Sequence, residues 1–104
     1  MECGVIALKA KGDKAGLRSL AYQVSQITTQ AVKSGVQIID CVITFGGVKD
    51  ILRELRVLDS KKRFDSLILY SPSQICKDAT EFEAFVEILE KEYKVRVRYI
   101  RSNF

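Results

Sequence analysis

The feature that most constrains the fold is a regular exchange between two kinds of segment along the chain. Short apolar runs at residues 3–8, 36–44 and 66–70 alternate with longer segments in which apolar residues recur every three or four positions. Short apolar runs are typical of buried strands, and the recurrence is typical of amphipathic helices. Strands that alternate with helices join through right-handed crossovers into a mostly parallel sheet. We therefore predict an α/β fold.

The expected elements can be bounded from the same patterns. The alternating stretch KVRVRYIR, residues 94–101, predicts a fourth strand near an edge of the sheet. Caps and stops predict three helices: from Leu17 to a stop at Gly35, from Lys49 to Ser60, and over residues 78–92 with Asp78 or Thr80 as the cap. A single domain, residues 1–104, with four strands and three helices in three layers is the resulting expectation.

Composition narrows the class of protein. The chain is 47% apolar and 104 residues long, enough for a core in one domain. No apolar run approaches the length of a membrane span, and the first residues lack a signal peptide, so a cytoplasmic protein without membrane contact is expected. The absence of histidine excludes Ser-His and Cys-His nucleophile pairs and most transition-metal sites. A net charge of +4 mildly favours an anionic partner.

Ligands of parallel sheets gather beyond the carboxyl ends of the strands. Four segments therefore matter, namely residues 9–14, 45–49 and 71–77 and the tail from residue 101. The candidate anion-binding or DNA-binding residues there are Lys9, Lys11, Lys14, Gly46, Gly47, Lys49, Gln74, Lys77 and Arg101. The glycines precede a helix whose free N–H groups favour anions. Two interpretations stay open: ordinary solvated loop lysines, or an edge that binds phosphate or nucleic acid.

No residue is predicted to be catalytic, and no metal or cofactor is expected. Ser71 and Ser73 have no activating base in view and suit turn or capping roles. The widely spaced Cys3, Cys41 and Cys76 form no CxxC pair, so they are expected to be buried or half-buried thiols rather than disulfides or zinc ligands. Asp50 and Asp78 are better explained as residues that begin helices, where a negative charge meets the helix dipole.

Two further groups of charges leave alternatives open. Arg96, Arg98 and Arg101 alternate along the predicted last strand, where they can guard a sheet edge against aggregation or contact phosphates. The third helix has an acidic outer face, which is either solvated or meets a basic partner and should not approach DNA. The glutamates of that face are Glu81, Glu83, Glu87, Glu90 and Glu92.

The order of elements and the loop sequences resemble the N-terminal catalytic domain of serine recombinases, the resolvases and invertases, over almost the whole chain. RSLAYQVSQITTQAVKSGVQIID is similar to the family's SLxxQ helix and second strand. FGGVKDILREL is similar to its SG, arginine and leucine-helix segment. FDSLILYSPSQICKDATEF resembles its strand, DRLxRD loop and next helix, and KVRVRYI resembles the strand that follows.

The resemblance implies a DNA-cleaving site whose chemical groups are missing here. In that family a serine in the first loop attacks a DNA phosphodiester while arginines stabilise the phosphate. This loop reads LKAKGD, with Ala10 and Gly12 where the arginine and serine would stand. Lys49 replaces the arginine before the leucine helix. In the DRLxRD loop, Ser73 replaces the aspartate and Gln74 and Lys77 replace the two arginines. Lysine and glutamine hold phosphate less well than the bidentate arginine fork.

Three hypotheses about function follow. The first is a catalytically inactive, resolvase-like domain that acts as a DNA-binding or protein-binding regulatory module related to site-specific recombination. Its partners would be DNA, bound weakly and in a salt-sensitive manner, a second copy of the chain, or an active recombinase. The second is a binder or enzyme for a small phosphorylated ligand, held by Lys11, Lys49 and Lys77 with Gly46 and Gly47. The third is a relic domain without a biochemical role of its own.

The family's members continue into a long dimerisation helix and a separate DNA-binding domain. This sequence stops after the predicted fourth strand, so both are expected to be missing. A dimer of the family's own kind is therefore not expected.

Overall fold

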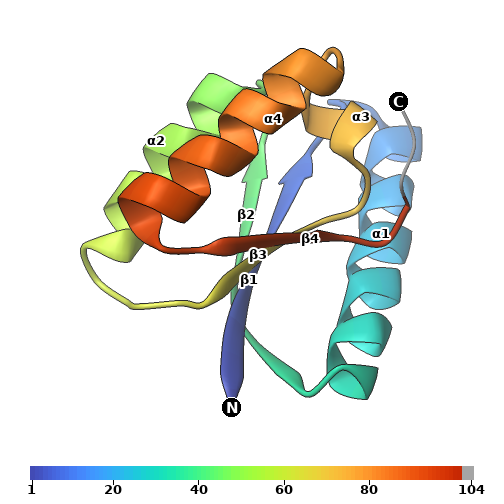
Figure 1. Ribbon diagram of the computed structural model, residues 1–104. Coiled ribbons are helices and arrows are strands. Elements are labelled where there is room, and N and C mark those ends of the chain that lie inside the picture. The colour runs from blue at the N-terminus through green and yellow to red at the C-terminus, as the bar shows by residue number, and fades with distance from the viewer. Residues whose placement is uncertain (102–104) are drawn as a thin grey trace.

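The computed structural model describes residues 1–101. Its four strands are all parallel and lie in the order β2-β1-β3-β4. The strands are β1 (Glu2–Lys9), β2 (Val36–Thr44), β3 (Ser66–Leu69) and β4 (Arg96–Tyr99). The helices are α1 (Lys14–Lys33), α2 (Val48–Asp59), the short α3 (Pro72–Ile75) and α4 (Ala79–Ile88), which continues into a π-helical turn, η1 (Leu89–Tyr93). Figure 1 shows these elements along the chain.

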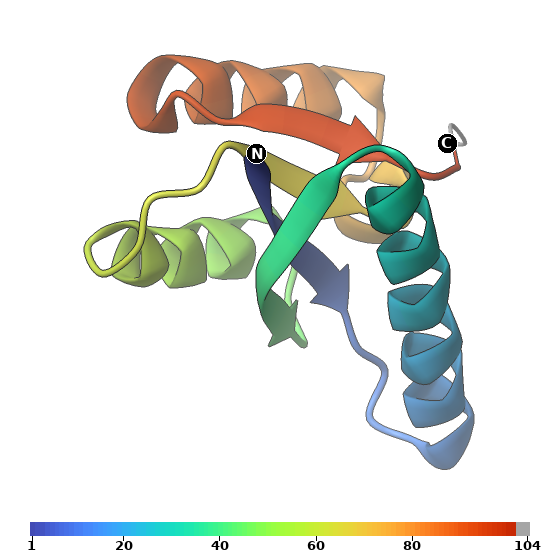
Figure 2. The same cartoon turned by 90° about the horizontal axis from the view of Figure 1, so that it is seen from below.

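The helices cover the two faces of the sheet unequally. The connection from β1 to β2 runs across the sheet in the opposite direction to the later two connections. Because βαβ crossovers are right-handed, α1 lies on one face and α2 and α4 lie on the other (Figure 2). Each face has its own buried cluster, one around Phe85 and Ile51 and the other around Ile27 and Ile6. The predicted three-layer α/β fold is confirmed.

The strand predictions agree with the burial of each strand. Val5 to Leu8 in β1 and Leu67 to Leu69 in β3 are buried, as expected of central strands covered on both faces. A Cβ atom at Gly4 would lie 2.8 Å from Val36 Cγ1, so glycine allows close packing at the start of β1. The predicted edge position of the last strand is confirmed, and β2 forms the other edge.

Several boundaries differ from the predictions for local reasons. α1 begins at Lys14 rather than Leu17, because the Asp13 carboxylate accepts a hydrogen bond from the Gly16 N–H and caps the helix there. Residues 71–77, expected as a loop, contain α3, whose first residue, Pro72, has no N–H to leave unpaired. The predicted helix over 78–92 ends in the π turn, and β4 is shorter than the stretch 94–101.

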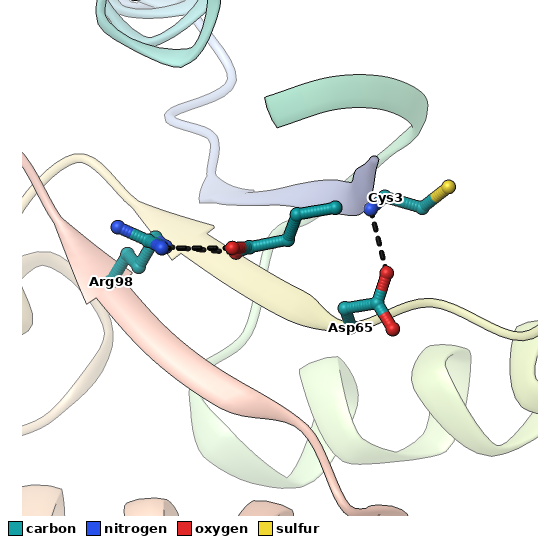
Figure 3. Close-up of polar contacts among 4 residues, drawn as sticks. Cys3, Asp65 and Arg98 are labelled. Carbon is teal, nitrogen blue, oxygen red and sulfur yellow. Dashed lines mark hydrogen bonds and ion pairs between the residues drawn. The ribbon is translucent and has the colours of Figure 1, made fainter. Parts of the chain in front are cut away.

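Polar contacts fasten the amino end of β1 to β4 and to the residue before β3 (Figure 3). The Asp65 carboxylate accepts a hydrogen bond of 2.7 Å from the Cys3 N–H, and the Asp65 N–H donates to the Cys3 carbonyl. On β4, the Arg98 guanidinium donates two hydrogen bonds of 2.9 Å to the Glu2 carboxylate of β1. Since β3 lies between β1 and β4, this ion pair crosses the middle of the sheet.

The three cysteines have different environments. Cys76 is buried and Cys3 is half-buried, as expected, whereas Cys41 is exposed. The expectation of a buried or half-buried thiol is therefore wrong for Cys41. Its position on β2 explains the difference, because β2 is an edge strand and α1 does not cover its outer half.

Candidate functional site

A cavity of about 580 Å³ opens beyond the carboxyl ends of β1 and β3. These neighbouring strands send their connections to opposite faces of the sheet, and such a switch in direction is where doubly wound sheets bind their ligands. The segment after β1 and the start of α1 form one wall, and the segment after β3 forms the other. The lining residues are Lys9, Lys11, Asp13, Ala15, Gly16, Ser19, Leu20, Gln23, Tyr70, Ser71, Ser73 and Gln74.

The first wall is a loop folded closely onto the start of α1. A Cβ atom at Gly16 would lie 2.5 Å from the Lys11 carbonyl oxygen, so only glycine lets the loop approach this helix turn. The Asp13 carboxylate, 2.6 Å from the Gly16 nitrogen, occupies the position where a helix N-terminus would attract an anion. An incoming anion must therefore be held by the Lys9 and Lys11 side chains rather than by the free end of α1.

Gln74 connects the two walls. Its side-chain carbonyl accepts a hydrogen bond of 3.4 Å from the Lys9 N–H, and its amide donates one of 2.6 Å to the Gln23 side chain on α1. Gln23 in turn donates to the Ser19 hydroxyl at 3.0 Å. This chain of amide and hydroxyl groups fixes the floor of the cavity between β1 and β3. Gln74 thus has a structural task at the position where the resemblance implies an arginine.

Ser71 and Ser73 of the second wall, and Cys76 outside the cavity, lack the arrangement of an activated nucleophile. The Ser71 hydroxyl is buried and lies 3.4 Å from the Ser73 hydroxyl, which is not a base. Cys76 is also buried. Burial, with the nearby Glu81 and Asp78 carboxylates, raises the pKa of its thiol to about 11. The Cys76 thiol is therefore protonated at neutral pH and is a weak nucleophile.

Arg101 lies at the rim of the cavity. Its Nε donates a hydrogen bond of 2.8 Å to the Tyr70 hydroxyl, and the guanidinium carbon is 5.6 Å from the centre of the Tyr70 ring. Tyr70 itself lines the cavity. The ring and the guanidinium group together make a planar, cationic border.

At the start of α2, where the sequence predicts an anion site, the Asp50 carboxylate lies close to Gly46. A Cβ atom at Gly46 would collide with the carboxylate of Asp50, which also pairs with Arg53 at 3.2 Å. Gly47 is close to α3, because a Cβ atom there would lie 3.1 Å from the Ile75 carbonyl oxygen. The glycines therefore let the β2–α2 loop pack against its neighbours, and Asp50 satisfies the helix dipole that an anion would have met.

The structure separates the predicted residues into two groups. Lys9, Lys11 and Gln74 line the cavity, and Arg101 reaches its rim through Tyr70. The others lie at the same end of the sheet but do not line the cavity, namely Lys14, Gly46, Gly47, Lys49 and Lys77. Asp78 caps α4 by accepting from the Glu81 N–H, while the Lys77 N–H donates to the Glu81 carboxylate.

Two positions from the family resemblance have clear environments. Ala10 is buried in the cluster beneath α1, and its N–H donates to the Thr44 carbonyl, so a side chain at this position points into the core. Gly12 lies in the exposed loop, with only the Phe45 ring near the position of a Cβ atom. Sequence reasoning missed Ser19, Gln23 and Tyr70. The polar pair four residues apart on α1 was an available signal for the first two.

A second hollow, of about 650 Å³, lies at the opposite end of the sheet and mixes both charges, with Glu2, Asp65 and Glu90 beside Lys94 and Arg96. We prefer the cavity at the carboxyl ends as the candidate site, because parallel sheets bind ligands there. Residues 1–101 contain no cluster of three or more cysteine, aspartate or glutamate side chains able to hold a metal ion. Within the same part of the chain, no helix combines the length and apolar character needed to cross a membrane.

Comparison of the chain with protein-family models, curated proteins and solved structures gives no match. The resemblance to serine recombinases therefore stays a prediction.

Proposed function

We propose that this protein is a non-catalytic, resolvase-like domain that binds the phosphate backbone of DNA with the carboxyl end of its sheet. The observation that carries the proposal is the imbalance of free charge at that end. The acidic side chains Asp13 and Asp78 accept hydrogen bonds at helix N-termini, and Asp50 pairs with Arg53. The exposed cationic side chains at this end include Lys9, Lys11, Lys14, Lys49, Lys77 and Arg101.

The distribution of these cations favours a long polyanion. Lys9 and Lys11 reach the cavity, whereas Lys14, Lys49 and Lys77 belong to the starts of helices outside it. A single phosphate group needs cations that converge on one point. A nucleic-acid backbone presents one charge after another and is held by cations spread along a surface. Spread lysines of this kind give weak, salt-sensitive binding without base recognition.

The proposal does not include cleavage of the bound strand. The side chains that line the cavity provide lysines, amides, hydroxyls and the Asp13 carboxylate, which accepts the Gly16 N–H. The buried Ser71 hydroxyl faces another hydroxyl and not this carboxylate. Binding without cleavage would suit a domain that regulates or accompanies an active recombinase.

A direct test is fluorescence anisotropy with a labelled duplex of about 20 base pairs, titrated between about 50 and 200 mM salt. The double variant Lys11→Gln/Lys49→Gln should weaken binding and reduce the salt slope by about 2, because each phosphate contact contributes about 1. Lys33→Gln/Lys61→Gln removes the same charge at the opposite end and is the matched control. Equal losses in both variants, or no binding by the native protein, would refute the proposal.

A second candidate function is binding of a small phosphorylated ligand in the cavity. It is favoured by the cavity's volume of about 580 Å³, which lies within the range of small-molecule sites. Its hydroxyl and amide lining also suits a sugar or nucleotide. A thermal-shift screen with nucleotides and sugar phosphates should then give a rise in melting temperature. That rise should be lost in Lys9→Gln/Lys11→Gln and kept in Lys49→Gln, whereas the DNA proposal requires Lys49 as well.

A further inference from the structure

The outer edge of β2 is long and carries little charge. The strand has nine residues, and Asp40 is its only charged one. A bulge interrupts the pairing with β1 between Ile38 and Asp40, and beyond it the Asp40 carboxylate accepts a hydrogen bond of 2.8 Å from the Cys41 N–H. Past this point the side chains of Cys41, Ile43 and Phe45 are exposed, Phe45 to 75%. An uncharged edge of this kind is a template for pairing with another strand.

The backbone of this segment is oriented for such pairing. The Thr44 carbonyl accepts a hydrogen bond from the Ala10 N–H, so the backbone groups of Thr44 face β1. Successive residues of a strand direct their backbone groups to opposite sides. The N–H and carbonyl of Ile43 therefore face outward, away from the sheet.

The two flanks of α1 differ in polarity. The flank that faces β3 and β4 is polar, and its residues Ser19, Gln23 and Gln30 line hollows on that side. By the helical period of 3.6 residues, the opposite flank lies above the β2 edge and carries Leu17, Ala21, Val24, Thr28 and Val32, with Lys14 in its first turn as the charged residue. Leu17 is 62% exposed and Val32 is 73% exposed. Apolar side chains thus extend along both the helix and the strand at this side of the molecule.

We infer that two copies of this chain associate through this β2–α1 surface, formed by Leu17, Ala21, Val32, Cys41, Ile43 and Phe45. The β2 strands pair in an antiparallel manner about a two-fold axis perpendicular to the sheet. The two sheets become one continuous sheet of eight strands, and the two α1 helices lie side by side on the same face. Each apolar flank then covers the other. The two helices are antiparallel, so Leu17 of one copy lies toward the C-terminal end of α1 in the other copy.

The placing of α1 supports a second copy as the occupant. α1 packs on a cluster that takes Val36 from β2, Ile6 and Leu8 from β1 and Ile68 from β3. The sheet therefore leaves the β2 flank of α1 uncovered, where Leu17 and Val32 are exposed. A second copy brings the same open strand and the same apolar flank to this side of the molecule.

Charge supports the same occupant. A two-fold interface places each patch against itself, so a patch rich in one sign of charge would repel its copy. The six residues of the β2–α1 surface are uncharged, and the two charged residues that border it, Lys14 on α1 and Asp40 on β2, have opposite signs. Asp40 also lies 3.7 Å from the Lys62 ammonium group. The other edge of the sheet, β4, carries Arg96 and Arg98 and would oppose like charges.

The test is the molar mass of the full chain by light scattering after size exclusion, over a range of protein concentrations. The native protein should approach twice the chain mass of 11.8 kDa as concentration rises. Ile43→Lys on the strand and Val32→Glu on the helix should each shift the mass to 11.8 kDa. Thermal melts will show whether each variant is folded. Because Val32 lies on an exposed helix surface, Val32→Glu should fold normally and keeps the test valid even if Ile43→Lys misfolds. Val57→Lys, on the exposed side of α2, is the control and should stay dimeric.

Three outcomes would overturn the inference. They are a native protein that stays monomeric at every concentration, a dimer that survives both Ile43→Lys and Val32→Glu, and open-ended oligomers in place of a closed dimer.

Discussion

The two edges of the sheet are built in opposite ways. β4 has four residues, two of them arginines, and α4 covers it through an edge-to-face contact between Phe82 and Tyr99, with ring centres 5.9 Å apart. β2 has nine residues and one charge, and the apolar flank of α1 stands above it without covering it. Short length, positive charge and a covering helix are the usual protections of an edge strand. β4 has all three of these protections, and β2 has only a bulge and one carboxylate.

This difference shows that one sheet can have a protected edge strand on one side and an unprotected edge strand on the other. Arg98 illustrates how closure works, because the same guanidinium that guards the edge is bound to Glu2 on β1. The sequence left two roles open for the alternating arginines, protection of a sheet edge or contact with phosphates. For Arg98 the ion pair with Glu2 favours the first role, because its guanidinium group is already bound within the protein. On β2 the corresponding outward positions carry Cys41 and Ile43, whose side chains offer no charge to repel a partner strand.

The largest expected effect concerns the core beneath the closed edge. Phe85 on α4 is 1% exposed and packs in the cluster that includes Leu67 and Val95. Phe85→Ala should lower the free energy of unfolding by about 3–5 kcal/mol, because it removes a buried ring and leaves a cavity. Urea denaturation at low protein concentration measures the change. Val32→Ala, on the exposed flank above the open edge, is the control, and a loss as large as that of Phe85→Ala would refute the contrast between the two sides.

A smaller effect is expected from the ion pair that fastens β4. Glu2→Gln should lower the free energy of unfolding at pH 7 by about 0.5–1 kcal/mol, since the pair is partly exposed and screened by solvent. Hydrogen bonding to Arg98 holds the pKa of the Glu2 carboxyl below its ordinary value of 4.5. A lowered pKa stabilises the fold above 4.5, and this contribution disappears as the pH falls through the folded value.

The pH dependence is what distinguishes this pair from simple packing. Unfolding midpoints of the native protein and Glu2→Gln should differ at pH 7 and converge in acid below the folded pKa. Glu87→Gln, which breaks the fully exposed pair with Lys91, is the matched control and should leave the midpoint unchanged. A difference between native protein and Glu2→Gln that persists at low pH would contradict the assignment.

The smallest effect is expected on the open edge itself. Asp40→Ala removes the acceptor of the Cys41 N–H and leaves this donor free for a partner strand. The free energy of unfolding of the monomer should change by only about 0.5 kcal/mol, because the bond is exposed. Self-association should become a few-fold tighter, as measured by the concentration at which the molar mass reaches the midpoint between monomer and dimer. Weaker association would mean that Asp40 promotes pairing of the β2 edges instead of opposing it.

Sequence patterns predicted much of the fold because the main elements are long enough to show their period. The buried runs at 3–8 and 66–70 and the alternation of KVRVRYI predicted two central strands and an edge strand, as found. α3 and η1 have four and five residues, too few to display a period. The apolar run VQIIDCVIT predicts a strand but not its place in the sheet, because strand order depends on contacts between distant segments. The exposure of Cys41 was missed for that reason.

The candidate site was predicted in part. The carboxyl ends of parallel strands meet at one end of the sheet, and this rule alone placed Lys9, Lys11 and Gln74 near one another. Which lysines share a cavity depends on contacts that no local pattern contains, such as the Gln74–Gln23 hydrogen bond. The two glycines before α2 suggested an anion site, and the glycine pattern could not show that the Asp50 side chain turns back over Gly46.

The ion pair between Glu2 and Arg98 joins residues 96 positions apart, and this has a consequence for synthesis of the protein. Of the four strands, β1 leaves the ribosome first and β4 after the other three, so the pair can close only once Arg98 has emerged. Until then the outer side of β3, an apolar strand, has no neighbour. A nascent chain that stalls before Arg96 would therefore expose this strand edge to other nascent chains.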